Sequence, residues 1–543
     1  MRSPRNYTST TLDHLGLVAG LYDELEIGSH LDSLLPQDLK QRHVSIGTAV
    51  KAMILNGLGF ANHALYLVPH FFHDKPVEHL LGEGISADQL NDDMLGRVLD
   101  SLYDYGVSPL YSQIACRAVR KLGLDGQTQH LDSTTFHLDG RLNSDRPPDT
   151  TEVIHITKGY SRDHRPDLNQ VGLQLIVESQ AGIPLLMRSL NGNSVDTKTF
   201  NETLKTHIKQ IDVDADVSYI IGDAALYTQA NLKEMDDCYW VTRVPESLKS
   251  AREMIHLFAE ELALTSTGKD SAMVCVESHY ANIPQRWLII YSRSSNEQAI
   301  ETVNNQLSKE ISAKEKALVK LGRERFSCQT DAKKALQTFC DQLKLVKMVA
   351  SQIISEPYYE SSGRPKKGQQ PTGVRYFIEG IFLPCEAACQ SQINRKSCFI
   401  LATNQMNCTE LSEQGIIDTY KNQQKVERGF RFLKDPLFHA ATLYLKSPKR
   451  IMALMMIMTL CLLVYAALEH RIREALNKAD EAFPNQQGKL IQNPTARWVF
   501  QFFTGIHLLR TQETPQIILN LNEHHQRLIH LLGKKYELFY SDG

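Results

Sequence analysis

Three acidic residues, far apart in the chain, lie at positions where chemistry is often carried out. Asp132 lies inside the strand-like segment HLDSTTFHL, where a half-buried carboxylate is costly unless it is paired or binds a cation. Asp223 ends the apolar segment VSYIIGD, which places it at the C-terminal edge of a sheet, where sites of α/β proteins tend to form. Glu427 lies in a helical segment rich in cations.

The segment around Glu427 carries a polar stripe. If each residue turns one continuous helix by about 100°, five polar side chains fall within an arc of about 80°: Tyr420, Gln423, Glu427, Arg431 and Lys434. A solvated helix face is the ordinary explanation of such a mixture. A phenol, an amide, a carboxylate and two cations on one stripe are also suited to binding a polyanion, and both interpretations stay open on the stripe alone.

Changes of hydrophobic period predict the elements that position these residues. Residues 1–125 have apolar residues at three- and four-residue spacing, which predicts a helical domain. Residues 126–245 predict an antiparallel meander followed by alternating helices and strands, hence a mixed sheet covered by helices. Residues 246–396 are predicted to be an insertion with strands and a charged helical hairpin. Residues 397–480 resume the core, and residues 481–543 are predicted to form a helical tail.

The segment 451–468 (IMALMMIMTLCLLVYAAL) is apolar over 18 residues. This length is at the lower limit of a membrane span, about 17–25 residues. A helix covered on all sides inside a large domain has the same composition. Because no second candidate span occurs and large polar regions flank this one, we expect a buried core helix and no membrane.

The composition is that of a globular protein. The 543 residues carry a formal net charge of −3 and are 42% hydrophobic, which excludes disordered, collagen-like and disulfide-scaffold chains. The ten cysteines show no paired framework, and the first residues lack the apolar region of a signal peptide, so we expect a reducing, cytoplasmic setting. The spacing Cys385-x3-Cys389 misses a zinc knuckle, and free thiols are the better interpretation. No phosphate-binding loop of the form G-x-x-x-x-G-K-[ST] is present, so we expect no use of ATP.

These acidic residues and their neighbours resemble a family. The chain is similar to the DDE transposases of bacterial insertion sequences, in the superfamily typified by insertion sequence 4 and the branch that resembles insertion sequence 1634. Asp132 matches the first aspartate of that family, and Asp223 matches the second, in a G-D-x-[AG] turn. The motif Tyr-x2-Arg-x3-Glu-x6-Lys aligns with Tyr420, Glu427 and Lys434, but Gln423 replaces its arginine.

The resemblance implies a fold and a mechanism. The core would be an RNase H-like α/β fold with a mixed sheet, in which Asp132 bridges two Mg²⁺ or Mn²⁺ ions while Asp223 and Glu427 hold one each. Two divalent ions activate the attacking oxygen and neutralise the leaving oxygen of an in-line displacement at phosphorus. The residues expected at the DNA are Tyr420, Gln423, Lys434 and, from the helical projection, Arg431.

The resemblance also implies partners. The substrate would be double-stranded DNA, cut at the terminal inverted repeats of the element and joined to target DNA by a homodimer near the bacterial nucleoid. The local charge fits DNA: residues 420–450 hold eight Lys and Arg against Glu427 and Asp435, a balance of +6, whereas residues 1–125 hold 10 against 15, a balance of −5. Three alternatives remain: a catalytically silent DNA-binding relative, a nuclease without strand transfer, and a membrane-anchored protein.

Overall fold

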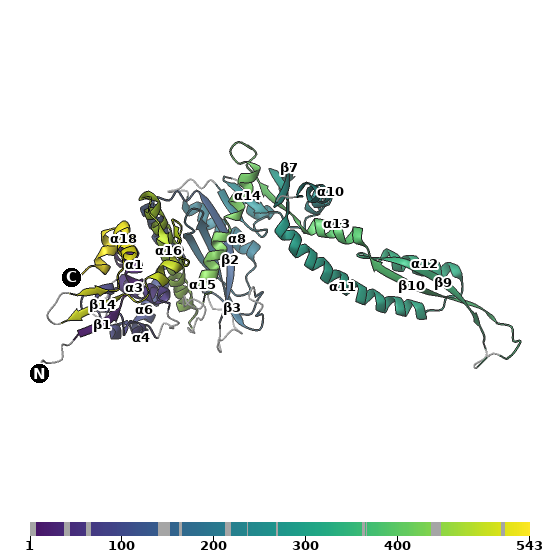
Figure 1. Cartoon of the computed structure of the whole chain (residues 1–543), viewed down its shortest axis with the longest axis horizontal. Helices are drawn as coiled ribbons and strands as arrows, with labels where there is room; N and C mark the ends of the chain where they lie inside the picture. Colours follow the sequence, from purple (N-terminus) through teal and green to yellow (C-terminus); the bar gives the residue numbers. More distant parts are fainter. Residues whose placement is uncertain are drawn as a thin grey trace. The chain divides into compact units, whose positions relative to one another are not determined.

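The computed structural model describes most of the chain, in two units. The described ranges are 7–36, 44–60, 67–138, 153–161, 165–211, 219–235, 237–267, 270–360, 364, 366–435, 447–511 and 516–542. The first unit comprises Met1–Thr242 and Gln414–Gly543, and the second comprises Arg243–Glu413 (Figure 1). Each unit is described by itself below.

The first unit opens with a strand and a set of helices. These are β1 (Tyr7–Thr11), α1 (Leu15–Glu24), α2 (Ile27–Leu34), α3 (Ile46–Leu58), α4 (Val68–Phe72), α5 (Val77–Leu81), the 3-10 helix η2 (Ala87–Leu90), α6 (Asp92–Tyr105) and α7 (Val107–Lys121). Side-chain caps begin two of these helices: Ser45 accepts a hydrogen bond from the Thr48 amide, and Asn91 accepts one from the Met94 amide. The described residues of 1–125 are therefore mostly helical, apart from β1, and they belong to the same unit as the sheet that follows.

A long apolar helix, α16 (Pro448–Lys478), forms the centre of the first unit. It packs against α1, α3, α6 and α7, and also against β4 and α15 (Figure 1). Its length and composition alone would suffice to cross a membrane, but 83% of its apolar window is buried inside the protein. The prediction of a buried core helix over 451–468 is thus confirmed.

The sheet of the first unit is mixed. Its strands are β2 (Thr128–Leu138), β3 (Asn169–Glu178), β4 (Pro184–Leu190), β5 (Tyr219–Gly222) and β6 (Tyr239–Arg243), in the spatial order β4-β3-β2-β5-β6. β3 is antiparallel to both β2 and β4, as the meander predicts, whereas β5 is parallel to β2 and to β6. The connecting helices are α8 (Asp196–Ile211) and α9 (Gln229–Glu234). An α/β architecture with a mixed sheet is therefore confirmed.

The C-terminal part of the first unit also contains strands. After α14 (Glu413–Lys421), α15 (Gln424–Leu433) and α16 come β12 (Phe483–Pro484), β13 (Leu490–Ile491), α17 (Ala496–Phe502), β14 (His507–Thr511), β15 (Ile517–Leu519), α18 (Glu523–Leu532) and α19 (Lys534–Tyr540). The prediction of a purely helical tail over residues 481–543 is therefore wrong, because the tail also contains these strands. β14 pairs with β1 from the other end of the chain, and no local sequence pattern reports such a distant partner.

The second unit holds three antiparallel strands and a long β-hairpin. Its elements are α10 (Lys249–Thr265), β7 (Ser271–Tyr280), β8 (Ile283–Ser292), α11 (Arg293–Arg323), α12 (Gln329–Asp341), β9 (Val346–Tyr358), β10 (Gly373–Pro384), α13 (Glu386–Lys396) and β11 (Cys398–Thr403). β8 lies between β7 and β11, and β9 pairs with β10. The predicted helical hairpin is not formed by α11 and α12: α11 packs along α13 and β10, and α12 packs on β9 and β10.

Candidate active site

Asp132 lies in the middle of β2, on a defined face of the sheet. Side chains alternate along a strand, so His130, Asp132 and Phe136 share one face and Ser133 points to the other. The Ser133 hydroxyl donates a hydrogen bond of 2.6 Å to Asp196 at the start of α8, which therefore covers the opposite face. Asp132 is only 8% exposed, and one of its carboxylate oxygens accepts a 2.7 Å bond from the Ser133 amide. The carboxylate is thus held in place inside the sheet.

Asp223 follows a strand that runs parallel to β2. In this pairing His130 is opposite Ile221 and Leu131 is opposite Gly222, so Asp132 and Asp223 are the next residues on neighbouring strands, which lie about 4.8 Å apart. The turn after β5 is fixed because Asp223 Oδ1 accepts from the Ala225 amide at 2.9 Å and its carbonyl accepts from the Thr242 hydroxyl at 2.8 Å. Two aspartates separated by 91 positions in the sequence are thereby neighbours.

Helix α15 covers the face of β2 that carries Asp132. At its start, the Lys425 ammonium donates to the carbonyls of Ser179 and Gln180 in the turn after β3. At its end, the Lys434 ammonium lies 5.8 Å from the centre of the Phe136 ring. The helix therefore runs in the direction of β2, with Glu427 on its first turn.

The environment beneath α15 is poorly hydrated. Burial, together with the positive charge of Lys425, lowers the pKa of His130 to about 4. Neither ring nitrogen of His130 has a hydrogen-bond partner among the described residues. Charges on this face of β2 are consequently little screened, which strengthens their interaction with any bound ion.

The polar stripe around Glu427 is divided between two helices, which corrects the single helix used for the sequence projection. α14 ends at Lys421, and α15 begins at Gln424 after a turn in which the Gln423 amide bonds to the Tyr420 carbonyl at 3.0 Å. Glu427 and Arg431 are exposed on α15, and Lys434 caps its C-terminal end. Tyr420 lies on α14 and is half-buried. Gln423 is only 7% exposed, so its side chain is part of the junction between the helices.

The aspartate pair has the chemistry that a divalent metal requires. Protein-bound Mg²⁺ is commonly held by one or two carboxylates together with phosphate oxygens and water. Asp132 and Asp223 can supply two carboxylates, and the burial of Asp132 favours a compensating cation. Within the described part of the chain, no three His, Cys, Asp or Glu side chains gather into a metal-holding group. Glu427 therefore lies on the helix that covers β2, and within the described residues it does not form a three-carboxylate cluster with the two aspartates.

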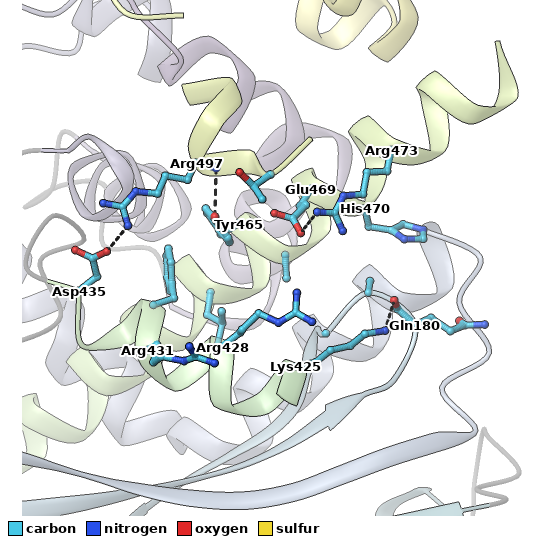
Figure 2. Close-up of a pocket in the computed structure, with 17 residues that line it drawn as sticks. Gln180, Lys425, Arg428, Arg431, Asp435, Tyr465, Glu469, His470, Arg473 and Arg497 are labelled. Atoms are coloured by element: carbon cyan, nitrogen blue, oxygen red, sulfur yellow. Dashed lines mark hydrogen bonds and ion pairs between the residues drawn. The ribbon is translucent and has the colours of Figure 1, made fainter. Parts of the chain in front are cut away.

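Sequence reasoning missed a cation-rich cavity on the other side of α15. The cavity has a volume of about 470 Å³ and lies between α15, α16 and the turn after β3 (Figure 2). Its basic side chains are Lys425, Arg428, Arg431, His470, Arg473 and Arg497. The local excess of positive charge between 420 and 450 indicates the first three, whereas the others join them only through the fold.

Three histidines outside the aspartate pair and the cavity, His79, His525 and His530, make structural contacts. His525 bonds to the Phe502 carbonyl at 2.9 Å and packs between aromatic rings, and His79 bonds to the Phe539 carbonyl at 3.0 Å. His530 contacts the carboxylate of Glu537. These contacts hold the three side chains within the fold or on its surface.

Comparisons with known proteins identify the family. The family described as "Domain of unknown function (DUF4277)" matches residues 7–116, and the family described as "Transposase DDE domain" matches residues 125–464. Comparison with curated proteins gave no match. One solved structure found by the comparison is described as "Cryo-EM structure of piggyBac transposase synaptic complex with hairpin DNA (SNHP)"; it is 10% identical, with a TM-score of 0.36 over 90% of this chain and 79% of that one. Because the transposase family matches more than half of the 543 residues, this chain belongs to the Transposase DDE domain family.

Proposed function

We propose that this chain is a DNA transposase that cuts the ends of an insertion sequence and transfers the cut strand into target DNA. In the first step a water oxygen attacks the scissile phosphorus, and the 3′-oxygen of the element leaves and takes up a proton. In the second step that 3′-hydroxyl attacks a target phosphodiester and displaces the target's own 3′-oxygen. The observation that carries the proposal is the pair Asp132 and Asp223, next to each other on parallel strands of a chain in this family.

The three acidic residues have distinct proposed roles. Asp132 and Asp223 would hold Mg²⁺ or Mn²⁺, and Glu427 would complete the set with its carboxylate from α15. Two such ions, when bound, lower the pKa of the attacking water and neutralise the leaving oxygen. The chain itself contributes a fixed aspartate pair, a poorly hydrated face beneath α15 and cations that neutralise phosphate charge.

We further propose that the core is RNase H-like. The strand order β4-β3-β2-β5-β6, with β3 antiparallel to its neighbours and β5 and β6 parallel to β2, supports this assignment. In such an order the first strand of the core lies in the middle of the sheet. Side chains of that strand can therefore lie beside the parallel neighbouring strand, which leads to Asp223, and also beneath the covering helix α15.

For DNA contact, we propose Tyr420, Arg431 and Lys434. Arg431 is exposed on the same helix as Glu427, and Lys434 stands at the end of that helix. The burial of Gln423 favours a role at the junction of α14 and α15 over a direct contact. Two copies of the chain would act together, one at each end of the element.

A cleavage and joining assay tests the function. The full chain would be incubated with a labelled duplex that carries the terminal repeat of its own element, with Mg²⁺ or with a chelator. We expect strand cleavage and joined products only with Mg²⁺, and a loss in Asp223→Asn greater than the roughly 10–100-fold typical of residues that merely support a metal ligand. Asp196→Asn, on the opposite face of the sheet, is the matched control and should retain activity. Cleavage that survives Asp223→Asn would overturn the proposal.

A second candidate is a catalytically silent, transposase-derived DNA-binding protein. The observation in its favour is that Glu427 does not form a three-carboxylate cluster with the aspartate pair in the described structure. The same assay separates the two functions, because a silent protein would bind the terminal repeat without any Mg²⁺-dependent cleavage. Cleavage without joined products would instead indicate a nuclease.

A further inference from the structure

The cavity beside α15 is lined by residues of the first unit only. α15 contributes Lys425, Arg428 and Arg431, and α16 contributes His470 and Arg473 (Figure 2). Uncharged side chains also line it, among them Leu462 and Tyr465 of α16. A volume of about 470 Å³ lies within the range of roughly 300–1,000 Å³ typical of ligand sites.

Part of the positive charge around the cavity is neutralised by the chain. Glu469 pairs with Arg473 at 2.6 Å, and Asp435 pairs with Arg497 at 2.7 Å, as the dashed lines in Figure 2 mark. These two are the acidic residues among those that line the cavity.

The cations around the cavity are close enough to repel one another. Burial lowers the pKa of Lys425, and the positive charges of Arg428 and Arg473 lower it further against the opposing effect of Glu178. Within the described part of the chain, Arg428 and Arg431 form no ion pair with a carboxylate. An anion in the cavity would therefore relieve this repulsion and meet two guanidinium groups whose fork geometry matches phosphate.

We propose that this cavity binds a phosphate of the DNA backbone, on the side of α15 away from the aspartate pair, through Arg428 and Arg431. This inference rests on the proposed function, since it takes DNA to be the substrate. Because α15 carries both Glu427 and the two arginines, a strand seated in the cavity is fixed relative to the cutting site. Arg428 acts here as a positioning residue, with no role at the scissile bond.

The salt dependence of DNA binding tests the proposal. Each phosphate neutralised by a protein cation adds about 0.9 to the slope of log affinity against log salt concentration. Fluorescence anisotropy of the full chain with a labelled duplex, over a series of salt concentrations, would measure that slope for the unaltered protein and for Arg428→Gln. We expect the variant to lower the slope by about 1 and to weaken binding equally for the terminal repeat and for an unrelated duplex, as loss of one phosphate contact does.

Two controls keep the result interpretable. Arg97→Gln makes the same chemical change at an exposed arginine on α6, among the acidic residues Asp92, Asp93, Asp100 and Asp104, and should leave the slope unchanged. Arg428→Lys should recover most of the slope, because the charge is kept, but less of the affinity, because the fork is lost. A thermal melt of each variant checks that the fold is intact.

The outcomes separate this inference from the proposed function. An unchanged slope in Arg428→Gln, in a protein that binds the duplex, would overturn the cavity assignment and leave the proposed function standing. A slope that falls equally in Arg97→Gln would also overturn it. If the unaltered chain binds no duplex at any salt concentration, both the inference and the proposed DNA substrate fail.

Discussion

At the scale of single residues, the site combines a buried carboxylate with a partner on the adjacent strand. Asp132 is 8% exposed and is held by the next amide along the chain. Burial makes its charge costly, so its position within a sheet has to be compensated by partners or by a cation.

Glu427→Gln should abolish cleavage while leaving DNA affinity within about twofold. The side chain is exposed on α15 and the substitution keeps its size, so the fold and the DNA-binding cations are untouched. The neutral amide is a weaker ligand for Mg²⁺ than the carboxylate that it replaces. Cleavage rate and duplex affinity, measured on the same preparation, check this. A parallel loss of both would show that Glu427 is a structural residue.

His14 should make the first unit sensitive to acid. Burial lowers the pKa of this residue to about 4, while its Nε2 bonds to the Leu58 carbonyl and its ring stacks on Phe500. In an unfolded chain this histidine takes up a proton near pH 6.5. The contribution of His14 to the free energy of unfolding is therefore full above that pH and is lost as the pH falls toward 4. The full loss is about 3 kcal/mol, from a shift of roughly 2.5 pKa units.

The measurement is the free energy of unfolding of the unaltered protein and of His14→Gln at several pH values. The variant should start less stable at pH 7.5 but lose less on going to pH 4.5. An identical pH dependence in both proteins would contradict the assignment.

At the scale of elements, the turn between β3 and β4 connects the sheet to α15. Glu178 is fully buried and accepts hydrogen bonds from three amides of that turn, those of Gln180, Ala181 and Ile183, at 2.6 to 2.8 Å. The carbonyls of the same turn receive Lys425. The orientation of the helix that carries Glu427 thus depends on a carboxylate outside the site.

Glu178→Gln should therefore destabilise the first unit by about 2–3 kcal/mol, because hydrogen bonds to a buried charged group are lost and an amide group faces amide donors. Chemical denaturation of the full chain measures this. Glu202→Gln, which alters an exposed partner of Arg188, should cost no more than about 1 kcal/mol. Equal effects of the two changes would argue against a specific role for Glu178.

Some of these elements follow from the sequence pattern, whereas their spatial arrangement does not. The meander of β2, β3 and β4 follows from period-2 alternation, and the buried α16 follows from an unbroken apolar run. The break at Gln423 was missed because no proline or glycine marks it. The proximity of Asp132 and Asp223 depends on strand order, and the position of Arg473 and Arg497 beside α15 depends on helix packing. Residue spacing along the chain predicts neither strand order nor helix packing.

At the scale of the whole molecule, the two ends of the chain fold together. The Tyr540 hydroxyl donates to the Asp13 carbonyl at 2.7 Å and accepts from the Leu17 amide at 3.2 Å. α1 and α19 approach closely because Gly16 and Gly20 leave room for the rings of Tyr540 and Tyr536. The C-terminal residues thereby belong to the same folded unit as the N-terminal helices.

Gly16→Ala should weaken the packing of α1 against α19. A Cβ at this position would lie 2.7 Å from the Tyr540 ring and 2.9 Å from Phe539 Cβ, and such overpacking costs about 1–3 kcal/mol. Limited proteolysis should release the C-terminal residues faster in the variant, and its unfolding transition should shift to lower denaturant. Gly373→Ala, where nothing lies within 4 Å of the added carbon, is the control and should change neither. An unchanged proteolysis rate in Gly16→Ala would contradict this packing.

The central claim, that Asp132 and Asp223 hold a metal ion at the scissile phosphate, is tested most directly by changing the leaving atom. A duplex in which sulfur replaces the 3′-bridging oxygen at the scissile bond would be cut with Mg²⁺ and with Mn²⁺, beside the ordinary duplex. Because Mg²⁺ prefers hard oxygen ligands and Mn²⁺ accepts softer ones, we predict slow cleavage of the sulfur substrate with Mg²⁺, recovery with Mn²⁺, and no cleavage in Asp132→Asn with either ion. Equal cleavage of both duplexes with Mg²⁺, or activity that persists in Asp132→Asn, would contradict the claim.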